Sequence, residues 1–173
     1  YTKQLRRRVG WLKPELFNDA LAKDLRKDLK ALMNVLKKAG GCWDPKHDMK
    51  LKELITLLTK KHANDKVLIF SQFADTVEYL AGQLKTAHLQ ALEGVTGNSE
   101  DPTGIAYRFS PTSNNQSIRP EDELRVVLAT DVLSEGQNLQ DCSIVVNYDL
   151  PWAIIRLIQR AGRVDRIGQK SDT

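Results

Sequence analysis

The segment from Val67 to Phe70 constrains the fold more than any other part of the sequence, because all four residues are apolar. A strand that is apolar at every position is typical of a parallel sheet covered on both faces. Further strands are predicted around 89–95, 125–129 and 143–148, with helical patterns between them. Strands that alternate with helices are joined by right-handed crossovers. We therefore expect an α/β fold in which helices cover both faces of a mostly parallel sheet.

Helices are predicted between these strands. Asp75 and Glu78 have the spacing of a capping box, which predicts a helix that begins at Asp75. A short helix over 102–109 and a final helix over 152–160 follow the second and fourth strands. The stretch 111–122 is rich in Ser, Asn and Pro, and we expect it to form a mobile loop.

The N-terminal part has helical periodicity and no predicted strand. Its leucines recur at steps of three and four residues, at Leu21, Leu25, Leu29, Leu32 and Leu36. Pro14 suits a first helical turn, and Gly40-Gly41 provides the stop. We expect a helical flanking segment over 1–47 and an α/β domain over 48–173. The basic run at 6–8 is either a phosphate contact or a solvated face, and such runs are usually solvated.

Composition narrows the class of protein. Hydrophobic residues at 41% suffice for a core, while the net charge of +4 does not separate solubility from nucleic-acid binding. No apolar run approaches the roughly 18 residues of a membrane span, so no membrane partner is predicted. Cys42 and Cys142 lie a hundred positions apart, which indicates a reducing compartment without disulfides. The histidines have no ligand spacing, so no metal site is predicted.

Polar clusters follow three of the predicted strands, where ligands of an open parallel sheet gather. The first cluster is Ser71-Gln72, and the second is Thr130-Asp131, which continues into 135–138. The third begins at Asp149 and leads into the final helix, which delivers Gln159, Arg160, Gly162, Arg163 and Arg166.

Arg163 and Arg166 are the most informative pair in these clusters. They are three residues apart, so a helical turn places both guanidinium groups on one side. Two planar guanidinium groups match the negative charge of a phosphoryl group in transfer. The alternative is a surface network in which the same arginines pair with Asp165.

Four motifs resemble those of superfamily 2 helicases. Gln159-x-x-Gly162-Arg163-x-x-Arg166, followed by Ile167-Gly168-Gln169, resembles motif VI in its Swi/Snf version. Residues 128–139 are similar to motif V, residues 66–73 to motif IV, and Val95-Thr96-Gly97 with Arg108-Phe109 to the looser motif between them. The motifs follow in the family's order over about 48–169. The resemblance is to the C-terminal RecA-like lobe of a bacterial Swi/Snf-type ATPase, and it implies a RecA-like three-layer α/β/α fold.

The resemblance also implies roles for individual residues. Arg163 and Arg166 are the expected catalytic arginine fingers, which reach the γ-phosphate of ATP. Gly136, Asn138 and Gln159 are expected on the ATP-binding side, with Gln159 coupling the lobes. The residues expected to hold the phosphates of the nucleic acid are Ser71, Gln72, Thr130 and Asp131.

The sequence contains neither a G-x-x-x-x-G-K-[ST] loop nor an Asp-Glu pair after a strand. The resemblance places both in a preceding RecA-like lobe of the same parent chain, which mainly binds ATP and Mg²⁺. The chain begins at Tyr1 rather than Met, and we interpret it as a piece of a longer protein. We expect the piece alone to hydrolyse no ATP.

The implied partners are double-stranded DNA, bound without regard to sequence, and RNA polymerase or another DNA-bound complex. The implied location is the cytoplasm of a bacterium, at the nucleoid. Ala153-Ile154 stands where eukaryotic remodellers have Asn-Pro, so nucleosome remodelling is not expected. A non-catalytic docking module and an RNA helicase lobe remain alternatives. Trp152 is expected in the core or at a helix start, and Asp149 either binds a ligand or holds the motif VI helix.

Overall fold

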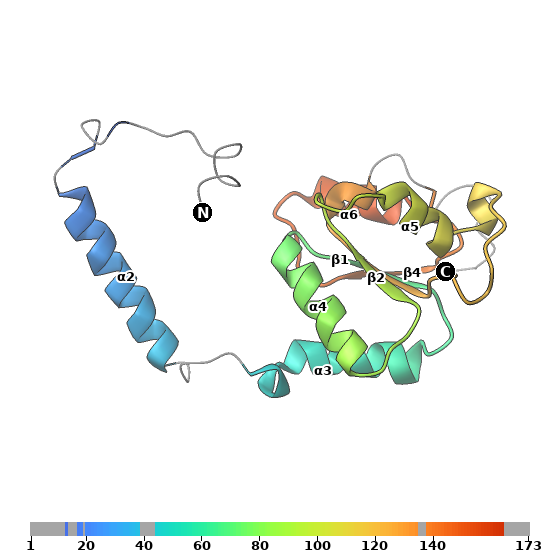
Figure 1. Cartoon of the computed structure of the whole chain (residues 1–173), viewed down its shortest axis with the longest axis horizontal. Coiled ribbons are helices and arrows are strands. Elements are labelled where there is room, and N and C mark those ends of the chain that lie inside the picture. The colour runs from blue at the N-terminus through green and yellow to red at the C-terminus, as the bar shows by residue number, and fades with distance from the viewer. Residues whose placement is uncertain (1–12, 14–16, 19, 39–43, 135–137, 165–173) are drawn as a thin grey trace. The chain divides into compact units, whose positions relative to one another are not determined.

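The computed structural model describes residues 13, 17–18, 20–38, 44–134 and 138–164 (Figure 1). The chain divides into two compact units, residues 1–44 and 45–173. The first unit contains α2 (Leu21–Lys38), so the helix predicted from the leucine pattern is present. Asn18 precedes this helix and accepts the backbone N–H of Ala20 on its side chain at 2.8 Å. The expected signals at Pro14 and Gly40-Gly41 lie outside the described residues.

The second unit is built on a four-stranded parallel sheet with the order β2-β3-β1-β4. Its strands are β1 (Val67–Phe70), β2 (Leu92–Val95), β3 (Val126–Ala129) and β4 (Ile144–Asn147). In the register, Val67 lies beside Val126 on one side and Ile144 on the other. Every residue of β1 and β3 is buried, whereas β4 is half-buried along its length at the sheet edge. The predicted α/β fold with a parallel sheet is confirmed.

Helices cover both faces of this sheet. One face carries α3 (Met49–Thr56), which continues as a π-helical turn over Leu57–Lys61, and α4 (Ala74–Thr86). The other face carries α5 (Pro102–Phe109) and α6 (Ile154–Ala161) (Figure 1). Strand residues alternate between two apolar cores: Val67 and Ile69 belong to the first, and Leu68 and Phe70 to the second. None of the described helices has the length and apolarity that a membrane span requires.

One local prediction was wrong. Helix α4 begins at Ala74, its N-cap is Phe73, and no side chain caps it, so the capping box at Asp75 does not form. The Ser71 hydroxyl accepts the N–H of Phe73 at 3.2 Å and turns the chain into the helix before Asp75 is reached.

The expected mobile loop at 111–122 begins with a 3₁₀ helix, Thr112–Asn114, that is held by hydrogen bonds. The carboxylate of Asp141 accepts the backbone N–H of Thr112 at 2.7 Å and of Ser113 at 2.9 Å, together with the Ser113 hydroxyl. Burial raises the pKa of Asp141, but the hydrogen bonds from Ser113 and Thr112 outweigh it and leave the pKa below its ordinary value.

Candidate nucleotide and nucleic-acid site

The polar clusters predicted from the sequence meet at one edge of the sheet. Because the strands are parallel and β1 lies between β3 and β4, their carboxyl ends are neighbours. Ser71-Gln72 follows β1, Thr130-Asp131 follows β3, and Asp149 follows β4 by two residues. The topology thus places these residues along one edge, where open parallel sheets bind ligands.

Asp149 joins the ends of β1 and β4. Its carboxylate accepts the hydroxyl of Ser71 at 2.5 Å and the backbone N–H of Gln72 at 2.9 Å. The side-chain amide of Gln72 also donates to the carbonyl of Leu150 at 3.3 Å. Ser71 is buried and its hydroxyl is committed to Asp149, whereas Gln72 is half-buried. Asp149 therefore contributes to the geometry of the edge through its hydrogen bonds within the protein.

Arg160 connects helix α6 to three strand ends. Its Nε donates to Oδ1 of Asp131 at 2.7 Å, and its Nη1 donates to Oδ1 of Asn147 at 2.8 Å. Its guanidinium carbon lies 5.0 Å from the ring centroid of Phe70, a cation–π contact. Among the described residues, nothing accepts a hydrogen bond from Nη2. Asp131 follows β3, Asn147 ends β4 and Phe70 ends β1, so one side chain fixes α6 against all three.

The burial of Arg160 makes these contacts energetically necessary. The side chain is 0% exposed, and a buried charge is costly unless it is paired and hydrogen-bonded. Asp131 supplies the opposite charge and also pairs with Arg156 at 3.0 Å on the exposed side. An ionised carboxylate, such as one paired with two arginines, only accepts hydrogen bonds, so it has no hydrogen to donate to a phosphate oxygen. Asp131, expected to contact nucleic acid, instead positions the arginine-bearing helix.

Helix α6 exposes apolar side chains while it buries this charge. Its inward residues are Leu157 and Arg160, followed by Val164 after the helix end. On the outward side, large apolar side chains are between 58% and 101% exposed: Leu150, Trp152, Ile154, Ile155 and Ile158. Trp152 is the most exposed, so the expectation that it lies in the core was wrong, although it does stand two residues before the helix start.

Arg163 lies in the turn that follows α6. The helix ends at Ala161, Gly162 is its C-cap, and the N–H of Arg163 donates to the carbonyl of Arg160 at 3.3 Å. The carbonyl of Arg163 accepts the N–H of Leu139 at 3.3 Å, so the motif V and motif VI segments are in direct contact. The Arg163 side chain is half-buried. Arg166 lies outside the described residues, so its pairing with Arg163 stays a prediction.

The residues expected on the nucleotide side are not all at this edge. Gln159 is exposed on α6, and Gly136 lies outside the described residues. The amide of Asn138 donates to the carbonyl of Ser113 at 2.9 Å, and the carbonyl of Asn138 accepts Asn114 at 2.8 Å. Asn138 thus fastens the 3₁₀ helix of 112–114, and its place near the ribose stays a prediction.

Thr130 is half-exposed, and its backbone N–H donates to Val95 at 3.0 Å. Among the residues expected to contact nucleic acid, Thr130 and Gln72 each have a half-exposed side chain and a place at this edge.

Arg160 was predicted only as a member of the third polar cluster, and Asn147 was not predicted as a residue of the site. The signal was present, because Leu157, Arg160 and Val164 recur at three- and four-residue steps, which places Arg160 on the inward face of a helix. Nothing in the sequence identifies Asn147 as its partner, since this contact depends on the strand order.

The residues at this edge do not fit a magnesium ion. Mg²⁺ requires octahedral oxygen ligands, and the two carboxylates here, Asp131 and Asp149, are committed to arginine and N–H donors. No group of three acidic, His or Cys side chains within the described ranges is placed to hold a metal ion.

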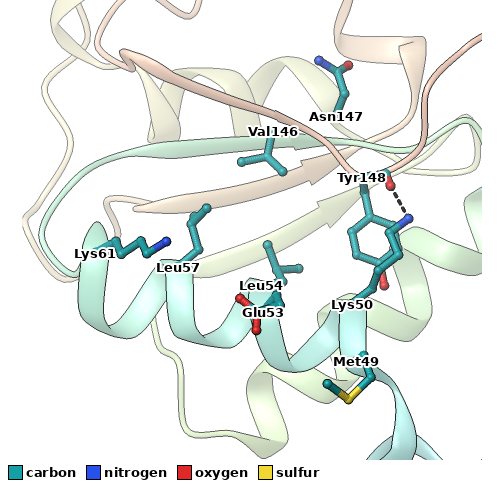
Figure 2. Close-up of a pocket in the computed structure, with 9 residues that line it drawn as sticks. All are labelled: Met49, Lys50, Glu53, Leu54, Leu57, Lys61, Val146, Asn147 and Tyr148. Carbon is teal, nitrogen blue, oxygen red and sulfur yellow. Dashed lines mark hydrogen bonds between the residues drawn. The ribbon is translucent and has the colours of Figure 1, made fainter.

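An apolar groove lies between α3 and strand β4, and Asn147 at the end of β4 is among its lining residues (Figure 2). Leu54 and Leu57 of the helical side face Val146 of the strand. Lys50 donates to the carbonyl of Tyr148 at 2.5 Å and lies 4.1 Å from its ring centroid. Burial, with smaller effects from Asp48 and Tyr79, raises the pKa of Tyr148 to about 12. None of the predicted site residues lines this groove.

Comparison with known proteins agrees with this geometry. Residues 49–168 match the family described as the helicase conserved C-terminal domain. The chain is 33% identical over 115 residues to the uncharacterized ATP-dependent helicase YqhH of Bacillus subtilis (strain 168), a match that covers 65% of this chain. The match covers only 18% of that relative's length.

Two solved structures share the fold. The C-terminal part of the Fun30 ATPase domain has a TM-score of 0.55 at 21% identity, covering 86% of this chain and 46% of that one. The E. coli DEAD-box protein SrmB, bound to regulator of ribonuclease activity A, has a TM-score of 0.52 at 26% identity. That match covers 70% of this chain and 65% of SrmB.

Proposed function

We propose that this chain, which belongs to the helicase conserved C-terminal domain family, is the second motor lobe of a Swi/Snf-type, ATP-driven translocase on duplex DNA. It supplies arginine fingers to an ATP site between two lobes, and it holds the phosphate backbone of the DNA. The preceding lobe of the same parent protein supplies the phosphate-binding loop and the magnesium ligands. The second compact unit begins at residue 45 and the family match at residue 49, so we assign the motor lobe to the second unit.

The observation that carries this proposal is the buried pair of Arg160 and Asp131. It joins the segment after β3 to the helix that leads to Arg163, and Leu139 contacts Arg163 through the backbone. The described parts of motifs V and VI are therefore joined to each other at the carboxyl edge of the sheet. Such contacts suit an arginine finger, because transition-state stabilisation depends on donors that are already in place.

The chemistry assigned to this unit is electrostatic. Negative charge is spread over the equatorial oxygens when a γ-phosphoryl group is transferred, and a guanidinium neutralises it. Arg163 and Arg166 provide that charge, Gln159 couples the lobes, and Asn138 with Gly136 faces the ribose.

The outward side of α6 supports docking to the other lobe. Ile155 and Ile158 are 58% and 62% exposed, and the same helix leads to Arg163. A finger that reaches a nucleotide held by another lobe must lie at the border of the two lobes. We assign the apolar surface of α6 to that border, where contact removes the isoleucines from water.

The nucleic-acid contact lies at the ends of β1 and β3. Gln72 and Thr130 offer half-exposed polar groups there, while Ser71 and Asp131 hold the edge in shape. Contacts of this kind bind phosphates and position the protein without reading bases. The proposed binding is therefore sequence-independent and weakens with salt.

The test is ATP turnover of the parent protein with Arg163→Ala and Arg166→Ala. Each change is expected to lower turnover by about 10³- to 10⁵-fold while DNA binding is retained. Lysine at either position rescues poorly, because it lacks the planar fork. The control is Lys85→Ala, which removes an exposed cation of α4 on the other face of the sheet and leaves turnover near that of the parent. Normal turnover by both folded alanine variants contradicts the proposed role.

RNA is the alternative substrate. The two substrates are separated by competition, with labelled duplex DNA displaced by unlabelled DNA or RNA duplexes of equal length. The proposal expects DNA to compete better. Stronger competition by RNA assigns the lobe to an RNA helicase.

A further inference from the structure

Helix α2 lies outside the family match at 49–168, and its charges are sorted by side. At about 100° per residue, its six cations fall within an arc of about 120°. They are Lys23, Arg26, Lys27, Lys30, Lys37 and Lys38. The large apolar side chains fall in a separate arc of about 160°. Asp28 lies within this arc, and Asp24 lies just outside it.

The cations of α2 are neighbours of one another. Lys23 and Lys27 are four residues apart, as are Arg26 and Lys30, and like charges at this spacing destabilise a helix. No carboxylate of the described residues forms an ion pair with them. A solvated helix face that is stabilised by its own charges contains both positive and negative side chains. The charged side chains on the basic face of α2 are all positive, so they fit an external anion.

The charge of the whole chain is concentrated in this unit. Residues 1–44 contain 11 Lys and Arg against 5 Asp and Glu, and the chain as a whole has 26 against 22. Residues 45–173 therefore have 15 against 17, a small net negative charge. The lobe that carries the helicase motifs thus gains little attraction for a polyanion from its net charge, whereas the N-terminal unit is strongly cationic.

We propose that the basic face of α2, formed by its six cations, binds the phosphate backbone of duplex nucleic acid. The inference rests on the proposed function, which makes a duplex the substrate. From Lys23 to Lys38 the face extends about 22 Å, enough to contact several successive phosphates of one strand. Packing of the apolar arc against any protein surface turns the cations outward. The contact is sequence-blind and adds a second binding surface to that at the sheet edge.

The experiment measures duplex DNA binding of the 173-residue chain over a range of salt concentrations. The test variant is Lys23→Gln with Lys27→Gln and Lys30→Gln, which keeps helix propensity. The matched control is Lys52→Gln with Lys60→Gln and Lys85→Gln, three exposed lysines of the second unit. Both variants remove three charges, so they differ only in where the charge is lost.

The α2 variant is expected to lower the slope of log K against log salt by about two to three, since each lost phosphate contact removes about 0.9. The control is expected to keep the slope. Equal slopes in the two variants, or an unchanged slope in the α2 variant, overturn this inference alone. Absence of any duplex binding by the unaltered chain overturns the proposed function with it. Vesicles with phosphatidylserine are the third arm, and tighter binding to them than to DNA assigns the face to a membrane instead.

Discussion

Arg160 is 0% exposed, and its charge is balanced by Asp131 while Arg156 pairs with the same carboxylate from the exposed side. The two arginines are chemically alike but differ in burial. Removal of one partner from a buried pair leaves an uncompensated charge, whereas an exposed pair contributes little. The stability lost with the buried pair can therefore be compared with the stability lost with the exposed pair.

We expect Asp131→Ala to lower the free energy of unfolding of the chain by about 3 kcal/mol, because Arg160 then remains buried without its counter-charge. Arg156→Ala is expected to cost less than about 1 kcal/mol. Urea denaturation of both variants measures the difference. Similar costs for the two variants show that the buried pair does not hold α6 in place.

Asp141 gives a pH dependence whose sign follows from its lowered pKa. A carboxyl group with a depressed folded-state pKa stabilises the fold above its unfolded pKa of about 3.9, and this contribution is lost as the pH falls through the folded value. Asp141→Asn is thus expected to lower the midpoint of thermal unfolding at pH 7, with a difference that shrinks below about pH 4.

Thermal unfolding between pH 7 and pH 2 measures this effect. Glu78→Gln, at an exposed carboxylate of α4, serves as the control and is expected to leave the midpoint unchanged. A difference for Asp141→Asn that stays constant through the acid range shows that the carboxylate does not stabilise the 112–114 segment through its charge.

At the level of elements, the strands and the short helix α5 (Pro102–Phe109) were predictable, whereas the start of α4 was not. The apolar run of β1 was found to the residue, and β2, β3 and β4 lie inside their predicted ranges. Apolar runs carry this information locally. The start of α4 depends on Ser71, which is held by Asp149 from a segment 78 residues away, and no local pattern records that contact.

The apolar face of α6 leads to a prediction for this element. Ile155→Gln with Ile158→Gln is expected to change the stability of the isolated chain by less than about 0.5 kcal/mol for each site, because both side chains are exposed. The control is Leu80→Ala in α4, a fully buried position, with an expected cost of about 2 to 5 kcal/mol.

Urea denaturation of the isolated chain gives these values, and ATP turnover of the parent gives the second readout. The isoleucine variant is expected to lower turnover in the parent although it leaves the chain stable. Unchanged turnover contradicts the placement of α6 at the border of the two lobes.

At the scale of the molecule, the order of the motifs was enough to predict the lobe and its fold. The same motifs placed Ser71, Thr130 and Asp149 at one edge, because parallel strands bring their carboxyl ends together. The motifs did not show which of these side chains form hydrogen bonds or ion pairs with other residues of the protein. Ser71 and Asp131 are committed to Asp149 and Arg160, and such commitments arise from side-chain packing rather than from the order of motifs.

We propose that this chain forms only half of an ATP-driven motor. The most direct measurement is ATP turnover by the isolated 173-residue chain, at saturating duplex DNA, compared with the parent protein under the same conditions. The chain alone is expected to remain at background, since Arg163 has no nucleotide to act on without the preceding lobe, while the parent turns over ATP. DNA-stimulated turnover by the isolated chain that disappears on Arg163→Ala contradicts this role as half of a motor, because the chain then contains a complete site.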